Sequence, residues 1–246
     1  MAFKKLKAKL RQRKLRSHSI VVDTDLSKRS FGARSGVWTV HPEGLGPHSI
    51  VYSFGVGDNI AWDLAMIETH GLELHAFDPT PRSIEWISRQ KLPPSFHFHD
   101  FGLAHFDGEI ELFEPRKVHK INYTSRAEKK GGIRKISCPV RRFGSIAQEL
   151  GHANIDILKV DIEGAEVEAL PDILESGFPI GQLLVEFHYN YPSISFESTL
   201  ERIARIRSAG FQILHISDRA YEFSFVHADN IQAELLQSGP TRGYRQ

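Results

Sequence analysis

Short apolar runs alternate with segments of helical periodicity from residue 49 onward, and this rhythm restricts the chain to few folds. The runs that predict strands are Ile50–Phe54, Leu72–Phe77, Phe96–His99, Ile155–Val160, Gln182–Phe187, Phe211–Ile216 and Tyr221–Val226. The segments that predict helices are Asn59–His70, Pro81–Lys91, Ser145–Leu150, a stretch from Gly164, and Phe196–Ala209. Such alternation is typical of βαβ units on a mostly parallel α/β sheet. The last two runs are too close for a crossover helix, so they predict an antiparallel hairpin.

The rest of the chain divides into flanking segments and one insertion. We expect five parts: a basic N-terminal tail at 1–16, an irregular segment at 17–48 with a strand-like run at Val37–Val40, an α/β domain at 49–228, an insertion in it near 105–142, and a C-terminal tail at 229–246. The insertion is inferred because two strand-like runs, Glu109–Phe113 and Ile136–Val140, flank a polar, Lys-rich stretch that breaks the rhythm.

Charge is concentrated in the N-terminal tail. Residues 1–16 contain eight Lys and Arg and no acid, so 23 basic and 30 acidic residues remain in the rest of a chain whose net charge is +1. A block of like charges favours a solvated, frayed terminus that packs nothing into the core. The alternative is a short amphipathic helix, with Phe3, Leu6 and Leu10 on one side, in weak contact with an anionic membrane surface. The acidic remainder would repel phosphate, so we expect no nucleic-acid partner.

The single cysteine, Cys138, excludes an internal disulfide and a cysteine-based zinc site. This is typical of a reducing compartment, and we expect the cytoplasm. The chain contains no run of about 18 apolar residues, so we expect no membrane-spanning helix.

Glycines and acids gather just after the predicted strands, where open α/β sheets bind their ligands. Gly55, Gly57 and Asp58 follow the first strand, Asp78 the second, Asp100 the third, and Asp161 and Glu163 the fourth. His188 follows the fifth strand. We therefore expect one site at the carboxyl edge of the sheet.

A nucleoside is the ligand that the first two strand ends favour. Gly55 and Gly57 allow a sharp turn and close approach of a ligand, and Asp78 lies 23 residues after Gly55, near the offset of an acid that binds ribose hydroxyls. A third glycine of a dinucleotide fingerprint would fall at Ile60, which argues against NAD. The simpler alternative for Asp78 is a turn residue before Pro79.

The most specific string lies between Lys159 and Glu166. Its Lys-x-Asp-x-Glu-Gly-x-Glu pattern resembles the motif of the FkbM-type S-adenosylmethionine-dependent methyltransferases. In the same order along 49–228, residues 77–81 resemble that family's Phe-Glu-Pro-Asn-Pro, residues 140–143 the strand before its fourth core strand, and residues 185–188 its Glu-x-His. The resemblance implies the Rossmann-like class I methyltransferase sheet of seven strands, S-adenosylmethionine as cofactor, and O-methylation of a sugar, glycan or other small-molecule hydroxyl.

Two positions depart from the family pattern. Ser53 stands where the family has Asp before the first glycine, and Asn59 where it has a later glycine. We expect Asp58 to supply the missing carboxylate. The resemblance then implies that Gly55, Gly57, Asp58, Asp78, Asp100 and Asp161 bind the cofactor.

The catalytic residues are expected at the ends of the fourth and fifth strands. His188 is the candidate general base, since histidine titrates near neutrality, and Glu186 or Asp161 is expected to hold its ring. A divalent metal bound by Asp161, Glu163 and His188 is a second hypothesis. A third is that Asp161 and Glu163 only cap the following helix. The other histidines have no partner at motif spacing, and we expect most of them at the surface.

Two further functions compete with methyl transfer. A binding or scaffold protein could keep the fold without turnover and dock through its basic tail, and Ser53 and Asn59 favour this alternative. The acids at 161, 163 and 166 oppose it. An NAD-dependent oxidoreductase is disfavoured by the broken glycine pattern.

Overall fold

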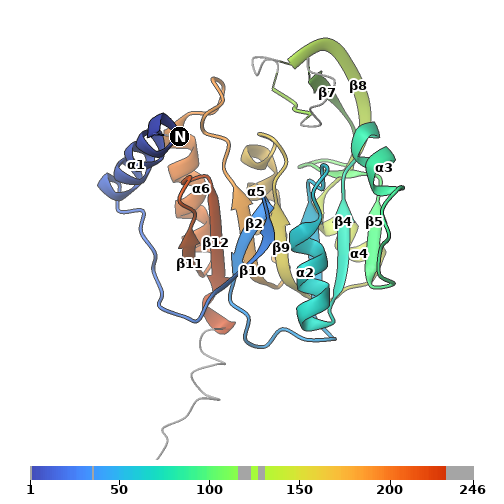
Figure 1. The fold of residues 1–246 in the computed structure, drawn as a ribbon, viewed down its shortest axis with the longest axis horizontal. Helices are drawn as coiled ribbons and strands as arrows, with labels where there is room; N and C mark the ends of the chain where they lie inside the picture. Colours follow the sequence, from blue (N-terminus) through green and yellow to red (C-terminus); the bar gives the residue numbers. More distant parts are fainter. Residues whose placement is uncertain (1, 35, 116–122, 127–130, 231–246) are drawn as a thin grey trace, which may run out of the picture.

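A computed structural model describes residues 2–34, 36–115, 123–126 and 131–230. Its centre is a seven-stranded sheet in the order β11-β12-β10-β9-β3-β4-β5 (Figure 1). The strands are β3 (Ile50–Phe54), β4 (Glu73–Phe77), β5 (Phe96–His99), β9 (Ile155–Val160), β10 (Ile180–Glu186), β11 (Phe211–Ile216) and β12 (Glu222–His227). Five neighbouring strands are parallel, and β12 is antiparallel to both β10 and β11. The predicted parallel sheet with a final hairpin is confirmed.

Helices cover both faces of this sheet. The helices of the α/β domain are α2 (Ala61–His70), α3 (Pro81–Ile87), α4 (Phe143–Leu150), α5 (Glu166–Glu175) and α6 (Phe196–Ser208). One buried cluster joins the sheet to α4, α5 and α6, and a second joins it to α2 and α3. Pro171 lies inside α5, which continues past it, and α3 ends four residues before the predicted Lys91.

The segment at 17–48 is more ordered than predicted. It contains β1 (Arg29–Ala33) and β2 (Gly36–Val40), which pair as an antiparallel ribbon. The side chain of Gln182 on β10 bonds both the N–H and the carbonyl of His41, at 2.9 and 2.8 Å, and so ties the end of this ribbon to the sheet.

The insertion forms a second sheet. Strands β6 (Gly102–Leu103), β7 (Gly108–Pro115) and β8 (Gly131–Arg141) pair in the order β6-β8-β7. In Figure 1 the outer parts of β7 and β8 rise above one end of the central sheet. The two predicted strands are confirmed, but both are longer than the apolar runs that predicted them.

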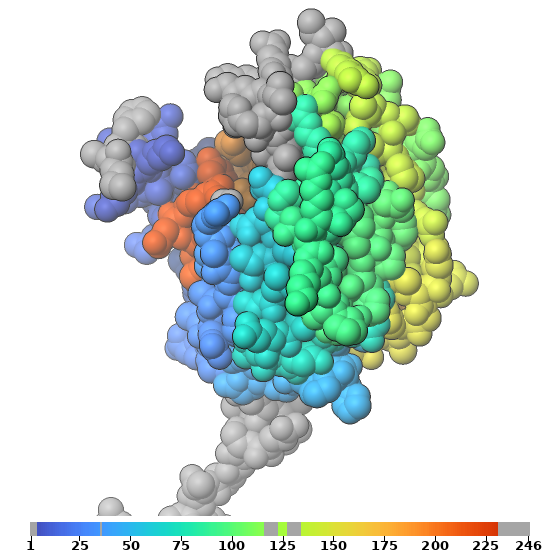
Figure 2. Space-filling model, turned by 45° about the vertical axis from the view of Figure 1, so that its right-hand side comes forward, coloured from blue at the N-terminus to red at the C-terminus, as the bar shows by residue number. Residues whose placement is uncertain are grey.

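The N-terminal residues fold as a helix, α1 (Ala2–Ser17), at the edge of the molecule beside the last strands (Figure 2). Leu15 is fully buried in the cluster that contains α6. Arg11 Nε donates to the carbonyl of Arg219 at 2.8 Å, and Gln12 Nε2 to that of Ser217 at 2.7 Å. The prediction that nothing in residues 1–16 packs on the core is therefore wrong. Local sequence could not reveal this packing, because the residues that α1 contacts lie about 200 positions away along the chain.

Two further predictions concern the termini and the membrane. Most of the predicted C-terminal tail, residues 231–246, lies outside the described residues. Within the part of the chain that is described, no helix has the length and apolar character needed to span a bilayer.

Candidate active site

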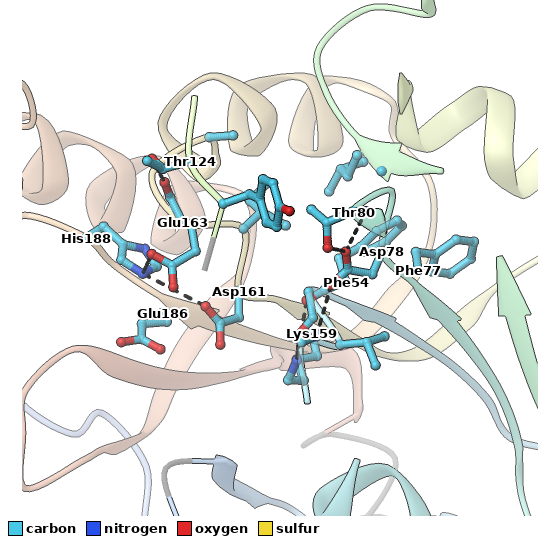
Figure 3. A pocket seen from close by; sticks show the side chains of 18 of the residues that line it. Phe54, Phe77, Asp78, Thr80, Thr124, Lys159, Asp161, Glu163, Glu186 and His188 are labelled. Atoms are coloured by element: carbon cyan, nitrogen blue, oxygen red, sulfur yellow. Dashed lines mark hydrogen bonds and ion pairs between the residues drawn. The ribbon is translucent and has the colours of Figure 1, made fainter. Parts of the chain in front are cut away.

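A cavity of about 830 Å³ lies at the carboxyl ends of the parallel strands. Figure 3 shows Asp78 and Thr80 on one side of it and Asp161, Glu163, Glu186 and His188 on the other. Strand β7 and the segment at 123–124 also contribute to its wall, so the insertion helps to enclose it. Of the predicted site residues, the cavity brings together Gly55, Gly57, Asp58, Asp78, Asp161, Glu163 and His188. It does not include Asp100, whose side chain is exposed after β5.

The turn after β3 requires a glycine for a structural reason. Gly55 has a φ of +84°, and a Cβ at this position would lie 1.7 Å from the carbonyl oxygen of Asp161. Only glycine allows the end of β3 to approach the end of β9 this closely. The turn therefore joins the two strand ends that hold the predicted cofactor and catalytic residues.

Asp78 organises the neighbouring strand end. Its Oδ2 accepts from the Gly57 N–H at 2.9 Å, and its Oδ1 accepts from the Thr80 N–H and hydroxyl at 2.9 and 2.6 Å. A carboxylate has about four acceptor positions, so one is left for a ligand. The expected pair of bonds to two ribose hydroxyls would need one of these contacts to give way. The turn-residue alternative accounts for the bonds to Thr80 but not for the bond to Gly57.

Asp63 on α2 is a buried carboxylate in this cavity that the sequence reasoning missed. Its carboxylate lies beside the hydroxyl of Ser53, which favours the charged form of the acid. Burial raises the pKa of Asp63, while the charge of Lys159 opposes that shift. Asp58, by contrast, is exposed at the cavity. The carboxylate missing at Ser53 is therefore better replaced by Asp63 than by Asp58.

Lys159 is a buried residue that lines the cavity and binds the backbone at the end of β3. Its Nζ donates to the carbonyls of Phe54 and Gly55, at 3.3 and 3.4 Å, although the residue is only 5% exposed. A buried ammonium is stabilised by such acceptors and by a nearby carboxylate, here Asp63. This gives the lysine of the motif a structural role beneath the glycine turn.

His188 is held by Glu166. One carboxylate oxygen of Glu166 accepts from the His188 N–H at 2.8 Å and lies 3.1 Å from Nδ1, and the other accepts from the Gly164 N–H at 2.8 Å. The opposite ring nitrogen, Nε2, lies 3.7 Å from Glu163 Oε2 and 3.9 Å from Asp161 Oδ1. Glu166, rather than Glu186 or Asp161, therefore orients the ring.

These contacts change the protonation of His188. Burial alone would lower its pKa, but the charge and hydrogen bond of Glu166, with the charges of Glu163 and Asp161, raise it to about 10. The ring is then an imidazolium at neutral pH, so it is a hydrogen-bond donor and not a ready base. The prediction that His188 titrates near neutrality is not supported.

Two of the acids near His188, Asp161 and Glu186, have raised pKa values. Burial and the charge of Asp161 raise the pKa of Glu186 to about 8, and burial raises that of Asp161. Asp161, Glu186 and His188 each offer a donor atom, and these atoms lie within 4.8 Å of one another. A metal ion here would thus find Glu186 in place of Glu163 of the predicted set, together with Asp161 and His188.

The helix-cap alternative for Asp161 and Glu163 is wrong. The residue that caps α5 is Ala165, and no capping hydrogen bond from a side chain is found there among the described residues. Glu163 instead has a φ of +51°, and its carbonyl accepts from the Thr124 hydroxyl at 2.7 Å. Its carboxylate accepts from the Tyr191 hydroxyl. A left-handed conformation is costly outside glycine and concentrates at functional sites.

Comparison with known proteins gives similar sequences and, separately, similar solved structures. The chain is 29% identical over 161 residues to "Probable methyltransferase-like protein 24" of Rattus norvegicus and of Homo sapiens, covering 63% of this chain and 37% of each relative. The match thus spans little more than a third of those proteins. Among solved structures, fibrillarin from Methanococcus jannaschii aligns with a TM-score of 0.46 at 9% identity, over 82% of this chain and 83% of that one. Aeropyrum pernix fibrillarin in complex with natively bound S-adenosyl-L-methionine aligns with a TM-score of 0.41 at 10% identity, over 74% and 67%.

The family comparison covers most of the α/β domain. Residues 49–213 match the Methyltransferase FkbM domain, from the first residue before β3 into β11. The matched segment holds both sides of the cavity. The chain therefore belongs to the FkbM methyltransferase family.

Proposed function

We propose that this chain is an S-adenosylmethionine-dependent methyltransferase that acts on a hydroxyl oxygen of a sugar, glycan or other small molecule. The observation that carries the proposal is one cavity with two chemically different sides. The turn of Gly55 and Gly57 with Asp78 forms one side, and His188 among three carboxylates forms the other.

The residues of the first side fit the cofactor. Asp78 keeps an acceptor position for a ribose hydroxyl, and the glycine turn leaves the backbone open to a ligand. The carboxylate of Asp63, which lines the cavity beside Ser53, can accept from the ammonium group of the cofactor's amino-acid portion. When bound, S-adenosylmethionine would supply a methyl group on a sulfonium: the acceptor oxygen would bond to the methyl carbon in line with the breaking C–S bond, and the sulfur would leave as a neutral thioether.

The second side suits an acceptor that must lose a proton. The charged ring of His188 can donate from Nε2 to the acceptor oxygen and stabilise negative charge as it develops there. The raised pKa of Asp161 makes its carboxylate a better proton acceptor at neutral pH than an ordinary aspartate, so the hydroxyl proton would pass to Asp161. The contribution of a positioned base is typically about 10²–10⁴-fold. A divalent metal on Asp161, Glu186 and His188 is the alternative way to acidify the hydroxyl.

The test separates cofactor binding from turnover. Calorimetric titration with S-adenosylmethionine should show that D63N weakens binding by about ten- to hundredfold, since a charged hydrogen bond contributes about 1.5–3 kcal/mol. The matched control D58N should stay within a few-fold of wild type. H188Q should keep cofactor affinity and lose transfer of labelled methyl to hydroxyl acceptors.

The binding and transfer experiments distinguish three possibilities. Absence of S-adenosylmethionine binding to the wild type would overturn the proposal. Cofactor binding without methyl transfer to any acceptor would support the scaffold alternative. Activity lost on addition of a chelator and regained with Mg²⁺ would favour the metal version.

Partners and compartment follow as further parts of this proposal. The exposed Lys and Arg of α1 suit weak contact with anionic lipid, and the excess of acids outside residues 1–16 speaks against nucleic acid. The unpaired, buried Cys138 suits the reducing cytoplasm.

A further inference from the structure

Three histidines and one glutamate gather outside the cavity, on β4, on β5 and after α4. Glu73 and His75 lie two apart on β4 and share a face of the sheet. His97 on β5 is the register partner of His75, and His152 follows the end of α4. These elements lie together at the right-hand edge of Figure 1. The expectation that such histidines lie at the surface is wrong for His75, which is 6% exposed.

The donor atoms of this cluster are spaced like the ligands of one metal ion. Single donor atoms of Glu73, His75 and His152 lie within 4.8 Å of one another. Glu73 Oε1 is 3.0 Å from His75 Nε2 and 3.5 Å from His97 Nε2. Two ligands of a tetrahedral zinc, with bonds of about 2.0–2.1 Å, are about 3.3–3.4 Å apart. His97 stands outside this group of three, with its ring stacked on that of His75 at 4.8 Å between centroids, so its exposed side chain would have to turn to become a ligand.

The second nitrogens of the two inner imidazoles already have partners. His75 Nδ1 lies 3.0 Å from His99 Nε2, and His152 Nδ1 lies 2.8 Å from the Tyr52 hydroxyl. Histidines that bind metals are usually oriented in this way, by a hydrogen bond at the nitrogen that does not face the ion. His75 Nε2 pairs with Glu73, itself a proposed ligand, and His152 Nε2 is the remaining nitrogen of the second ring.

The cluster is also accessible. The side chains of Glu73 and His97 are 43% and 42% exposed, whereas that of His75 is 7% exposed. An ion would therefore enter from the solvent side and meet the buried imidazole last. Metal sites need such a route of access as well as ligands of suitable kind and number.

We propose that Glu73, His75 and His152, with His97 as fourth ligand, bind a divalent transition-metal ion of the zinc type. Imidazole and carboxylate ligands in this ratio suit zinc. The ion would clamp β4, β5 and the turn after α4 together. It would be a structural ion, since all four ligand positions are taken by the protein. This site is independent of the methyl-transfer chemistry and shares no residue with the cavity.

The site has one physical connection to the cavity. His99 stacks on Phe77, and Phe77 stacks on Phe54, with ring centroids 4.6 and 4.3 Å apart. Both phenylalanines line the cavity. Because His99 bonds the proposed ligand His75, zinc would restrict the motion of the stacked rings of His99, Phe77 and Phe54, the last of which precedes the glycine turn.

Zinc binding by the full-length protein tests the proposal. The protein is stripped with a chelator and titrated with ZnCl₂ by calorimetry. The double variant E73Q/H97Q should weaken zinc binding by at least about tenfold, the loss typical even for residues that only orient a ligand. Both altered side chains are over 40% exposed, so the fold should persist, and an unchanged melting temperature without zinc would show it.

Two controls make the result decisive. E85Q/H105N removes one exposed glutamate and one exposed histidine elsewhere and should bind zinc like the wild type. H188Q alters the active-site cluster instead. Equal zinc affinity of E73Q/H97Q and wild type would overturn the proposal, and so would a loss of zinc binding in H188Q alone. X-ray absorption of the zinc-loaded wild type should show imidazole ligands, and fewer of them in H152Q.

Discussion

Glu166 determines the protonation of His188, and this can be tested by one substitution. E166Q keeps the side chain's shape but removes the charge that stabilises the imidazolium. A hydrogen bond to a charged group contributes about 1.5–3 kcal/mol, so we expect the His188 pKa to fall by about one to two units from its value of about 10. Titration of the His188 ring signals by NMR measures it.

The matched control lies on the same helix. E168Q removes a carboxylate that pairs with Arg126 and does not touch His188. Its His188 titration should match the wild type. A pKa near 10 retained in E166Q would show that Glu163 and Asp161 alone hold the proton on the ring.

The site residues that follow strands could be predicted from the sequence, whereas the helix residues that contact them in the fold could not. Asp161 and His188 follow continuous apolar runs, so parallel pairing places them at one edge of the sheet. Glu166 lies in the first turn of a helix, where an acid needs no function. Only the packing of α5 against the end of β10 buries it beside His188. Asp63 was missed because nothing in its spacing distinguishes it from a surface acid of α2.

Among the described residues of helix α1, one side chain is buried in the core. Leu15 is fully buried, whereas Leu10 of the same helix is 56% exposed. We expect L15A to lower the free energy of unfolding by about 2–5 kcal/mol, through lost transfer energy and a residual cavity. L10A should change it by less than about 0.5 kcal/mol. Urea denaturation of both variants checks this, and equal stabilities would mean that α1 is not part of the folded core.

The outer side of α1 is suited to an anionic surface. Lys4, Lys5, Lys9 and Arg13 are exposed, as are Leu6 and Leu10. Each such charge near an anionic membrane contributes about 1 kcal/mol. Replacing the four basic residues by Gln should therefore abolish co-sedimentation with phosphatidylserine vesicles. Neutral vesicles should bind neither protein, and binding by the wild type should weaken at high salt. Unchanged binding of the fourfold variant would contradict the prediction.

The elements found from sequence share one physical property. Ile50–Phe54, Ile155–Val160 and Phe211–Ile216 have the predicted bounds, and a buried strand of this kind is largely apolar along its length. Elements that depend on distant partners could not be found in this way. Helix α1 is held by residues near 217–219, and the insertion's strands extend because they pair with each other rather than with the central sheet.

At the scale of the whole molecule, the active-site charges make folding sensitive to pH. In the folded protein the pKa of His188 is about 10 and that of Glu186 about 8, against ordinary values of 6.5 and 4.5. Both groups therefore hold protons in the folded state that the unfolded chain releases. His188 stabilises the fold fully below about pH 6.5, and this contribution is lost as the pH rises through about 10. The raised pKa of Glu186 makes folding less favourable as the pH rises from about 4.5 to 8.

Both effects have the same sign, so these two groups should lower the free energy of unfolding as the pH rises from 7 to 9, above the range in which the lowered pKa values of His75 and His99 act in the opposite direction. E186Q removes the ionisation of Glu186 and should make the decline flatter between pH 7 and 8, while the part due to His188 remains. E85Q, which alters an exposed glutamate on α3, should follow the wild-type curve. Urea unfolding at each pH, with a chelator present so that no metal occupies the acids, measures all three proteins. Parallel curves of unfolding free energy against pH for E186Q and wild type would show that Glu186 is ionised in the folded state at pH 7. In that case its hydrogen bond from Arg219, at 3.0 Å, would favour the charged form more than burial and the charge of Asp161 oppose it.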